Sequence, residues 1–312
     1  MKYLFIVNPV AGTHDAVETV IPQIHRALDS TDADFSIEIT EHPGHARELA
    51  HAAAQSGEQI RICACGGDGT LCEVINGAYG YDNVELACYP CGSGNDFIRC
   101  FGDAEQFRDI TSVVSGSAKR LDALRVNGDT VCFNLLSVGI DADVNYGAGR
   151  WRRFPLFRGR ISYDLSLFSC LLKSLGKHLR LDIGGEVREG DFLLCAVGNG
   201  RVYGGGYIAA PEAKADDGLI DVVTVKKIPL TRIVKVLDKY KHGEHIINGE
   251  VIEELRDCMT FNCVQSMSIS SDKEFVLNID GESIKTTSAE VTMLPASWNF
   301  VVPESCIEKT KA

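Results

Sequence analysis

A glycine-rich run around a single aspartate, residues 66–70, is the strongest chemical signal in the sequence. It stands directly after an apolar run typical of a buried strand and directly before a segment with helical spacing. Glycines let a backbone approach a phosphate closely, and the start of a helix offers free N–H groups. An aspartate in such a loop repels phosphate unless it acts through a divalent metal. The run therefore predicts a site for a metal-bound phosphate, rather than a tight turn, which would need only one glycine.

Two more loops of this kind follow predicted strands. One spans residues 91–97, Cys-Gly-Ser-Gly-Asn-Asp-Phe, and its Asp96 is a candidate N-cap for a helix that begins there. The other spans residues 8–12, Asn-Pro-Val-Ala-Gly, after the first predicted strand. Open parallel sheets bind ligands outside the carboxyl ends of their strands. Three loops at such strand ends can therefore converge on one ligand with several phosphates.

Two acidic turns stand in the second half of the chain, Asp-Asp-Gly at 216–218 and Asp-Gly-Glu at 280–282. Each of them alone is an ordinary turn sequence. Carboxylates are nevertheless what phosphoryl transfer needs, because it depends on metal ligands and on a base beside the attacking hydroxyl. A carboxylate base works best when burial or other carboxylates raise its pKa toward neutrality.

The first part of the chain must position the three glycine loops. Its apolar patterns alternate between strands and helices with short connections, as in a parallel sheet covered on both faces. The predicted strands are 3–7, 35–40, 60–65 and 85–89, and the predicted helices are 17–28, 45–55, 70–79 and one that begins at 96–101. These elements predict an α/β nucleotide-binding lobe.

The character of the sequence changes after these elements. Valine- and threonine-rich runs are separated by Asn-Gly, Gly-Gly and Asp-Gly, which are hairpin signals. The runs are 124–126, 131–138, 179–183, 192–198, 219–225, 267–270 and 275–279, and two helical segments, 162–176 and 230–242, interrupt them. We therefore predict an α/β plus β fold with the active site in the cleft between two lobes. The parallel-sheet α/β lobe covers 1–122, to which 297–312 can return, and the antiparallel β-rich lobe covers 123–296.

Length, charge and hydropathy exclude several classes of protein. A chain of 312 residues exceeds the size at which one core usually stops growing, which favours two lobes. Its net charge of −12 argues against a nucleic-acid binder. No apolar run reaches the roughly 18–20 residues that span a bilayer, and the short apolar start predicts a strand instead of a secretory signal. We expect a cytoplasmic protein.

Two close cysteine pairs stand among the twelve cysteines, Cys63 with Cys65 and Cys88 with Cys91. A zinc site needs its cysteine pairs in a loop context. Cys63, Cys65 and Cys88 instead fall in apolar runs, so the sequence favours small buried side chains in a reducing compartment. Zinc binding and redox chemistry stay open as alternatives.

A basic segment, residues 149–181, stands apart in this acidic chain, with six Arg and two Lys against one Asp. Arginines alternate with aromatic residues at its start, and an apolar helical stretch follows. Basic side chains beside exposed aromatic ones favour an anionic membrane surface. The alternatives are a core helix with a solvated basic flank, and a surface between two copies of the chain in a homodimer.

Together these motifs carry a family resemblance. The chain resembles the diacylglycerol kinase catalytic-domain family, bacterial soluble lipid kinases that are similar to sphingosine and ceramide kinases. The glycine-rich run at 66–70 is shared more widely, with NAD kinases and phosphofructokinases. The full series of motifs is more specific and follows the family's order: Asn8-Pro9 with Gly12, Gly66–Thr70 with Glu73-Val74 and Asn76-Gly77, residues 92–97, Pro211 through 216–219, and 280–282.

The resemblance implies that the first lobe binds ATP. Asp68 would hold the Mg²⁺–ATP phosphates, Asp96 would lie in the same cleft, and Glu282 would be the general base that takes the proton of the lipid hydroxyl. The implied nucleotide contacts are Asn8, Pro9, Val10, Ala11, Gly12, Thr40, Gly66, Gly67, Asp68, Gly69, Thr70, Leu71, Cys72, Glu73 and Ser93.

The resemblance also implies a structural Mg²⁺ site. Asp217 would be its side-chain ligand, and the carbonyls of Lys214 and Leu219 would complete it. Asp122 matches the aspartate that links this ion to the active site through water. One departure from the family is Cys72, where many relatives have Asn, so that an amide donor near the nucleotide is lost.

The residues and the resemblance together predict an ATP- and Mg²⁺-dependent lipid kinase that converts diacylglycerol to phosphatidic acid, peripheral at the inner membrane face. Another small-molecule kinase of this fold, such as an NAD kinase, is one alternative, against which residues 92–97 and 280–282 argue. A catalytically silent lipid-binding regulator is another, against which the intact Asp68 and Glu282 argue. A nicotinamide-dependent dehydrogenase would need Gly-x-Gly-x-x-Gly after the first strand, where residues 8–12 stand instead.

Overall fold

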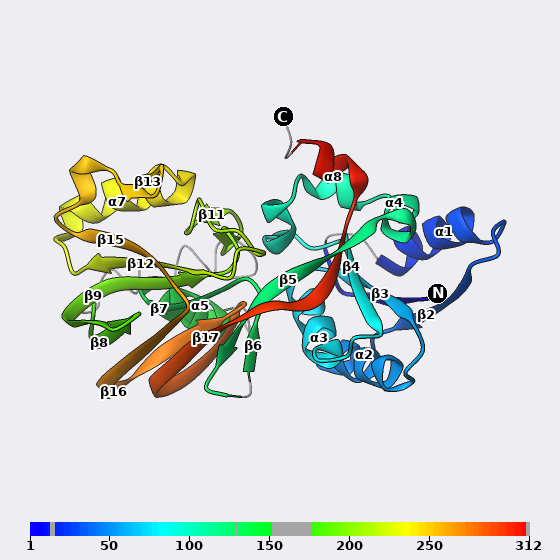
Figure 1. Ribbon diagram of the computed structural model, residues 1–312, viewed down its shortest axis with the longest axis horizontal. Coiled ribbons are helices and arrows are strands. Elements are labelled where there is room, and N and C mark those ends of the chain that lie inside the picture. The colour runs from blue at the N-terminus through cyan, green and yellow to red at the C-terminus, as the bar shows by residue number, and fades with distance from the viewer. Residues whose placement is uncertain (13–15, 129, 152–175, 310–312) are drawn as a thin grey trace. The chain divides into compact units, whose positions relative to one another are not determined.

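The computed structural model describes residues 1–12, 16–128, 130–151 and 176–309, without the side chains of 147–151 and 307–309. It divides into two compact units (Figure 1). Unit 1 comprises Met1–Asp122 and Pro295–Ala312, and unit 2 comprises Ala123–Leu294. The chain passes from one unit to the other within two long strands, β5 (Ser117–Val126) and β17 (Glu282–Val302).

Unit 1 is built on parallel strands with helices between them. The strands are β1 (Lys2–Val7), β2 (Asp34–Ile39), β3 (Ile60–Gly66) and β4 (Val84–Pro90), and the helices are α1 (Ala16–Leu28), α2 (His45–Gln55) and α3 (Asp68–Ala78). In the sheet, β1 pairs with β2 and β3, and β3 pairs with β4, always in parallel. Every residue of β3 is buried, as the continuous apolar run in its sequence indicates.

The cysteines of β3 belong to the core of unit 1. Cys63 and Cys65 are buried and pack with apolar side chains of β1 and α1. This is the structural role that the sequence favoured. Within the described ranges, one group of three metal-ligating side chains lies close together, and its members, His42, His45 and Glu48, include no cysteine.

After β4 the chain forms short turns instead of the helix expected from residue 96. They are η1 (Phe97–Cys100), η2 (Ala104–Phe107) and α4 (Ile110–Ser115). Asn95, just before η1, has a positive φ of 48°, and Asp103, just before η2, forms a capping box with Gln106. Phe97 packs against Trp298 and Phe300 of β17, and β17 continues into α8 (Glu304–Lys309).

Unit 2 consists mainly of antiparallel strands. The larger ones are β6 (Thr130–Cys132), β7 (Leu135–Gly139), β8 (Lys177–Ile183), β9 (Glu186–Gly198), β12 (Ile220–Lys226), β15 (Met259–Val264) and β16 (Ser266–Ile279). They lie in the order β15-β12-β9-β7-β16-β17, with β8 joined to β9 and β16. Shorter elements are β10 (Val202–Tyr203), β11 (Tyr207–Ile208), β13 (Ile246–Ile247), β14 (Glu250–Val251) and η4 (Glu253–Leu255). The prediction of a mixed α/β protein with extensive antiparallel sheet is confirmed.

In the described part of unit 2, two α-helices accompany the sheet, α5 (Ile140–Trp151) and α7 (Leu230–His242). The sequence predicted α7 with these bounds but did not predict α5. The expected strand 131–138 is split into β6 and β7, because the main chain of residues 133–135 turns to donate hydrogen bonds to a side chain. The expected runs 267–270 and 275–279 form one strand with a bulge, β16.

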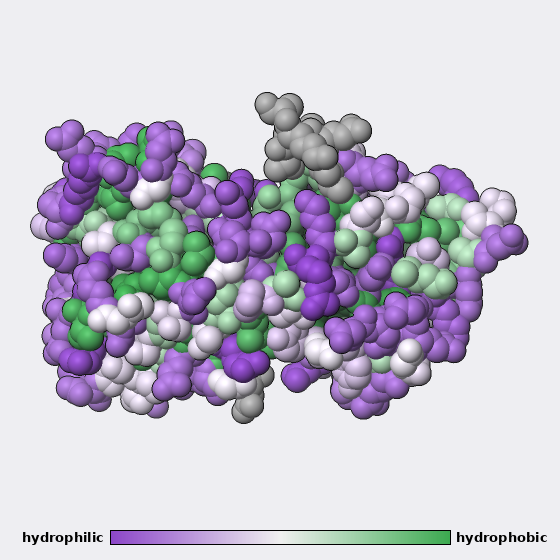
Figure 2. Space-filling model, viewed as in Figure 1, coloured by the Kyte–Doolittle hydropathy of each residue, from purple (hydrophilic) through white to green (hydrophobic). Residues whose placement is uncertain are grey.

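The basic segment at 149–181 and the helix expected over 162–176 fall largely on residues 152–175, which lie outside the described residues. In the part of the chain that the structure describes, no helix is long and apolar enough to cross a membrane. Polar side chains cover most of the face seen in Figure 2, with smaller apolar areas among them.

Candidate active site

The three glycine loops of unit 1 touch through their main chains. A Cβ atom on Gly12 would overlap the carbonyl oxygen of Cys91, and one on Gly92 would lie 2.6 Å from the Cα of Gly67. Such close approaches leave no room for a side chain, so these positions require glycine. The loops follow β1, β3 and β4, whose carboxyl ends lie at one edge of the sheet. The structure thus brings together the three loops that the sequence singled out.

Side-chain hydrogen bonds tie the first loop to helix α3. The Asn8 amide donates to the Thr70 hydroxyl (2.9 Å), and its carbonyl oxygen accepts the N–H of Val10 (3.1 Å). Thr70 is buried beneath Gly66, where a Cβ would overlap the threonine hydroxyl. Val10 is 85% exposed, so the tip of the loop stays accessible to a ligand.

Asp68 lies in the first turn of α3, which begins two residues earlier than the sequence predicted. One carboxylate oxygen accepts the N–H of Asp96 (2.7 Å), and a Cβ on Gly94 would lie 2.8 Å from the other. Burial raises the pKa of the Asp68 carboxyl, and main-chain N–H groups of residues 95–97 oppose that rise. The carboxylate is thus held among N–H groups at the start of a helix, where the helix dipole favours negative charge.

Asp96 lies beside Asp68, but it does not cap the following turn as predicted. Its φ of −71° and ψ of −41° are helical, whereas an N-cap residue has extended angles, and its side chain makes no capping bond to the described main chain. Its main-chain N–H is used for Asp68 instead. Its buried carboxylate lies 3.9 Å from the Nε of Arg99 and 3.6 Å from the position of a Cβ on Gly94.

The donor set of unit 1 suits a polyphosphate with a bound Mg²⁺. Mg²⁺ takes oxygen ligands, commonly one or two carboxylates together with substrate phosphates. The carboxylates of Asp68 and Asp96 both reach the space beside Gly94, which has no side chain to fill it. Main-chain N–H groups in glycine loops and at a helix start are the usual partners of phosphate oxygens. These residues therefore fit Mg²⁺ and ATP.

Two other residues predicted to contact the nucleotide, Leu71 and Glu73, have side chains that are already used within the protein. Leu71 is 1% exposed, so its side chain belongs to the core and only its main chain can face a ligand. The carboxylate of Glu73 accepts the N–H groups of Gly44 (3.0 Å) and Ala46 (3.2 Å) and thereby caps the start of α2. That capping role was not evident from the sequence, because the two partners lie in another element.

The remaining predicted contacts lie at or near the loops. Thr40 extends the pairing of β2 with β1, because its N–H donates to the carbonyl of Val7 (2.9 Å). Ser93 is exposed, and Cys72 is half-buried. The amide of Asn76 donates to the main-chain carbonyl of Cys72 (3.0 Å), which fixes this amide along α3.

In unit 2, a half-buried side chain holds the 280–282 turn in place. The Asp280 carboxylate accepts the N–H groups of Phe133 (2.9 Å), Asn134 (3.1 Å) and Leu135 (3.0 Å), and the thiol of Cys132 lies 3.3 Å away. The main chain turns sharply here, with a φ of 47° at Asp280. Burial raises the pKa of Asp280 to about 6, and the bonds from residues 133–135 oppose the rise.

Glu282, the predicted base, follows this turn as the first residue of β17. It is exposed, so its carboxylate can accept a proton from a ligand. The amide of Asn145 on α5 donates to the carbonyl of Gly281 (2.8 Å) and to the side-chain oxygen of Asn278 (3.0 Å). Asp280 and Asn145 thus position Glu282 from two sides. The turn itself was predicted, but the residues that anchor it lie more than a hundred positions away along the chain.

The second acidic turn of unit 2 carries the residues predicted for a structural Mg²⁺. Asp217 folds back to accept the N–H of Leu219 (3.0 Å), and Lys214 is exposed beside it. Burial raises the pKa of Asp221 to about 6, and the charges of Asp217 and Glu212 contribute to the rise. The charges of Asp217 and Glu212 thus give this turn a negative potential, which suits a cation.

Asp122, predicted to act through water, belongs to unit 1. Its carboxylate accepts the N–H of Ala296 (2.6 Å), and its main-chain carbonyl accepts the indole N–H of Trp298 (2.9 Å). Within unit 1 this buried aspartate therefore ties β5 to β17. The bond to Ala296 supports its positive φ of 46°, a backbone angle that residues other than glycine rarely adopt.

Known families and proteins match this chain over most of its length. Residues 2–126 match the family model described as "Diacylglycerol kinase catalytic domain", and residues 134–302 match "YegS C-terminal NAD kinase beta sandwich-like domain". The diacylglycerol kinase of Bacillus subtilis is 26% identical over 282 residues, covering 89% of this chain and 91% of that protein. The diacylglycerol kinase of Mycobacterium tuberculosis is 29% identical over 317 residues, covering 97% and 95%. YtlR of Bacillus subtilis is 30% identical over 310 residues, covering 94% and 97%.

Solved structures show the same fold. A diacylglycerol kinase of Bacillus anthracis superposes with a TM-score of 0.70 at 23% identity, covering 98% of both chains. An NAD kinase of Archaeoglobus fulgidus in complex with ATP superposes with a TM-score of 0.53 at 12% identity, covering 98% of this chain and 96% of that one. The fold is thus the one that these kinases share. The chain belongs to the diacylglycerol kinase catalytic-domain family.

Proposed function

We propose that this protein is a lipid kinase that transfers the γ-phosphoryl group of ATP to the hydroxyl of diacylglycerol. One observation carries the proposal: the three glycine loops converge around the fixed carboxylate of Asp68. Family membership supports it, because the relatives from Bacillus subtilis and Mycobacterium tuberculosis cited above at 26% and 29% identity are named diacylglycerol kinase. We further propose that the protein works at the cytoplasmic face of a membrane, where such an acceptor is found.

In unit 1, main-chain N–H groups of the loops would bind the phosphates of ATP. Asp68 and Asp96 would hold Mg²⁺, which neutralises the charge that develops on the transferred phosphoryl group. The residues Gly12, Gly67 and Gly92 keep the loops close enough to surround one ligand. Phosphoryl transfer depends mostly on such positioning, so the protein needs few groups that react themselves.

In unit 2, Glu282 would act as the general base. The hydroxyl oxygen of the lipid attacks the γ-phosphorus, the bond to the bridging oxygen of ADP breaks, and the hydroxyl proton passes to the Glu282 carboxylate. Asp280 and Asn145 fix the main chain of the turn that precedes Glu282. A structural Mg²⁺ held by Asp217, with the carbonyls of Lys214 and Leu219, would stabilise the second acidic turn.

An NAD kinase activity is the second candidate, because an NAD kinase shares the fold. A transfer assay separates the candidates: γ-labelled ATP and Mg²⁺ are offered with diacylglycerol, a sphingoid base or NAD, and the wild type is compared with Asp68→Ala. We expect label in diacylglycerol alone and none with the variant. Label in NAD would establish the second candidate, and near-normal turnover by a folded Asp68→Ala protein would refute the role of Asp68. Intact lipid binding without any transfer would indicate a silent regulator.

A further inference from the structure

Helix α7 of unit 2 presents an apolar edge to solvent. Its buried face, with Ile233, Val236 and Tyr240, packs in a core beneath the sheet. On the flank of this buried face Leu230 is 52% exposed and Val234 is 72% exposed. Residues four apart lie next to each other on a helix, so the two side chains form one small apolar patch.

The segment that carries this patch is rich in lysine. Residues 226–242 contain five Lys and one Arg against one Asp, a net charge of +5 in a chain whose total is −12. Lys241 stands seven residues after Val234, which places it on the same face two turns further along, and Lys235 is the neighbour of Val234. Lys226 precedes the helix, and all three lysines are exposed.

Two acidic side chains near α7 are paired with its basic residues, whereas the exposed Glu254, whose main-chain carbonyl accepts a hydrogen bond from Arg232, forms no ion pair among the described residues. Asp257 binds Arg232, and Glu244 lies 2.6 Å from the ammonium group of Lys239. Asp238, on the helix itself, lies 3.8 Å from His242. Among the described residues, Lys226, Lys235 and Lys241 form no ion pair, so their charge is available to an outside partner.

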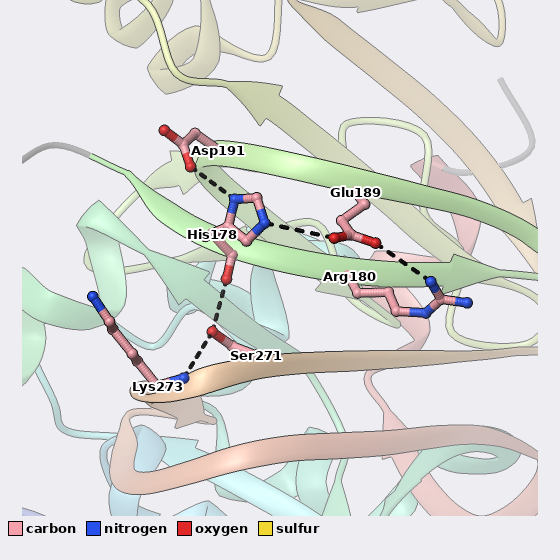
Figure 3. Close-up of polar contacts among 6 residues, drawn as sticks. All are labelled: His178, Arg180, Glu189, Asp191, Ser271 and Lys273. Carbon is pink, nitrogen blue, oxygen red and sulfur yellow. Dashed lines mark hydrogen bonds and ion pairs between the residues drawn. The ribbon is translucent and has the colours of Figure 1, made fainter.

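Acidic side chains of β8 and β9 near the start of α7 are also paired with basic ones. Lys227 lies 3.7 Å from Asp191, which also binds His178 (3.0 Å). Figure 3 shows His178 between Asp191 and Glu189, with Arg180 on the far side of Glu189. These paired carboxylates therefore add little electrostatic repulsion toward an anionic surface. In Figure 2, green apolar atoms lie among purple ones over the region where Figure 1 draws α7.

We propose that α7 docks this protein on an anionic lipid bilayer. Leu230 and Val234 enter the headgroup region, while Lys226, Lys235 and Lys241 face lipid phosphates. A patch of two aliphatic side chains is far smaller than the roughly 800 Å² that each partner of a stable protein complex buries. Shallow insertion with several cations is the pattern of a helix that lies in a membrane interface. The inference rests on the proposed function only in that a bilayer holds the acceptor.

Vesicle binding tests this docking surface. Sedimentation with phosphatidylcholine vesicles, with and without phosphatidylglycerol, compares the wild type with Leu230→Ser/Val234→Ser and Lys235→Glu/Lys241→Glu. We expect binding to the mixed vesicles that weakens as salt rises, a loss of about tenfold or more for the first variant, and about fivefold per lysine for the second. Matched controls are Val187→Ser, which removes a 47% exposed side chain from β9, and Arg125→Glu, which reverses an exposed charge on β5. Both controls should bind like the wild type.

The outcomes separate this inference from the proposed function. Unchanged binding by both α7 variants, or equal binding to both kinds of vesicle without salt dependence, would overturn the docking role. Thermal melting shows that each variant is folded, and activity on a short-chain diacylglycerol dispersed without vesicles should match the wild type. Vesicle binding through α7 by a protein that phosphorylates no lipid would overturn the proposed function and leave the docking surface standing. Normal lipid kinase activity in a protein whose vesicle binding does not depend on α7 would overturn the docking surface and leave the proposed function standing.

Discussion

Unit 1 and unit 2 hold their candidate chemical groups by different means. In unit 1 the glycine loops meet main chain to main chain, as at Gly92 and Gly67, and no side chain could be added between them. In unit 2 a single carboxylate, that of Asp280, gathers three N–H groups and thereby fixes the turn before Glu282. The first arrangement fails when an atom is added, and the second fails when a polar group is removed.

The largest effect on activity should come from replacing Glu282, the residue that follows this turn. Glu282→Gln keeps the shape of the side chain but removes the base, so kcat should fall about 10²–10⁴-fold. ATP affinity should stay unchanged, because the nucleotide residues belong to unit 1. Steady-state transfer to diacylglycerol and ATP titration measure the two quantities separately. A collapse of ATP affinity in this variant would show that Glu282 is no general base.

Replacing Asp280, whose carboxylate anchors this turn, should lower stability as well as activity. Asp280→Ala leaves three buried N–H groups without their acceptor, so the free energy of unfolding should fall by about 3–5 kcal/mol. Asp182→Ala is a matched control, because Asp182 accepts only one N–H, that of Gly185, in an exposed hairpin. Its loss should be about 1 kcal/mol. Urea unfolding measures both, and equal losses would remove the distinction between a buried hub and an ordinary turn.

The main-chain packing of unit 1 can be broken by one methyl group. In Gly92→Ala the new Cβ would lie 2.6 Å from the Cα of Gly67, which cannot move aside as a side chain could. We expect a loss of about 1–3 kcal/mol in the free energy of unfolding. Gly69→Ala adds the same atom where nothing lies within 4 Å, and it should be neutral or slightly stabilising. If the two variants unfold alike, the close approach of the loops is not what requires glycine.

The same difference explains how much the sequence could predict. The glycine loops are local signals, since each directly follows an apolar strand such as β3, and parallel pairing alone brings strand ends together. The anchors of unit 2 are distant: Asp280 binds residues 133–135, and Asn145 reaches Gly281 from a helix. Side-chain periodicity contains no information about such pairs. It also missed α5 itself, whose glycines and aspartates are poor helix formers.

The smallest effect should come from the side-chain pairing at the start of β8. The hydrogen bond to Asp191 raises the pKa of His178, burial opposes the rise, and Glu189 adds to it. A histidine whose pKa is higher in the folded than in the unfolded state stabilises the fold below its unfolded pKa of about 6.5. That contribution disappears as pH rises through the folded pKa. The urea midpoint of the wild type, relative to that of His178→Gln, should therefore fall as pH rises from below about 6.5 to above the raised pKa of the folded state. Because His178 is exposed, high salt should reduce the difference, and a difference that salt leaves unchanged would show that its source is not this pairing.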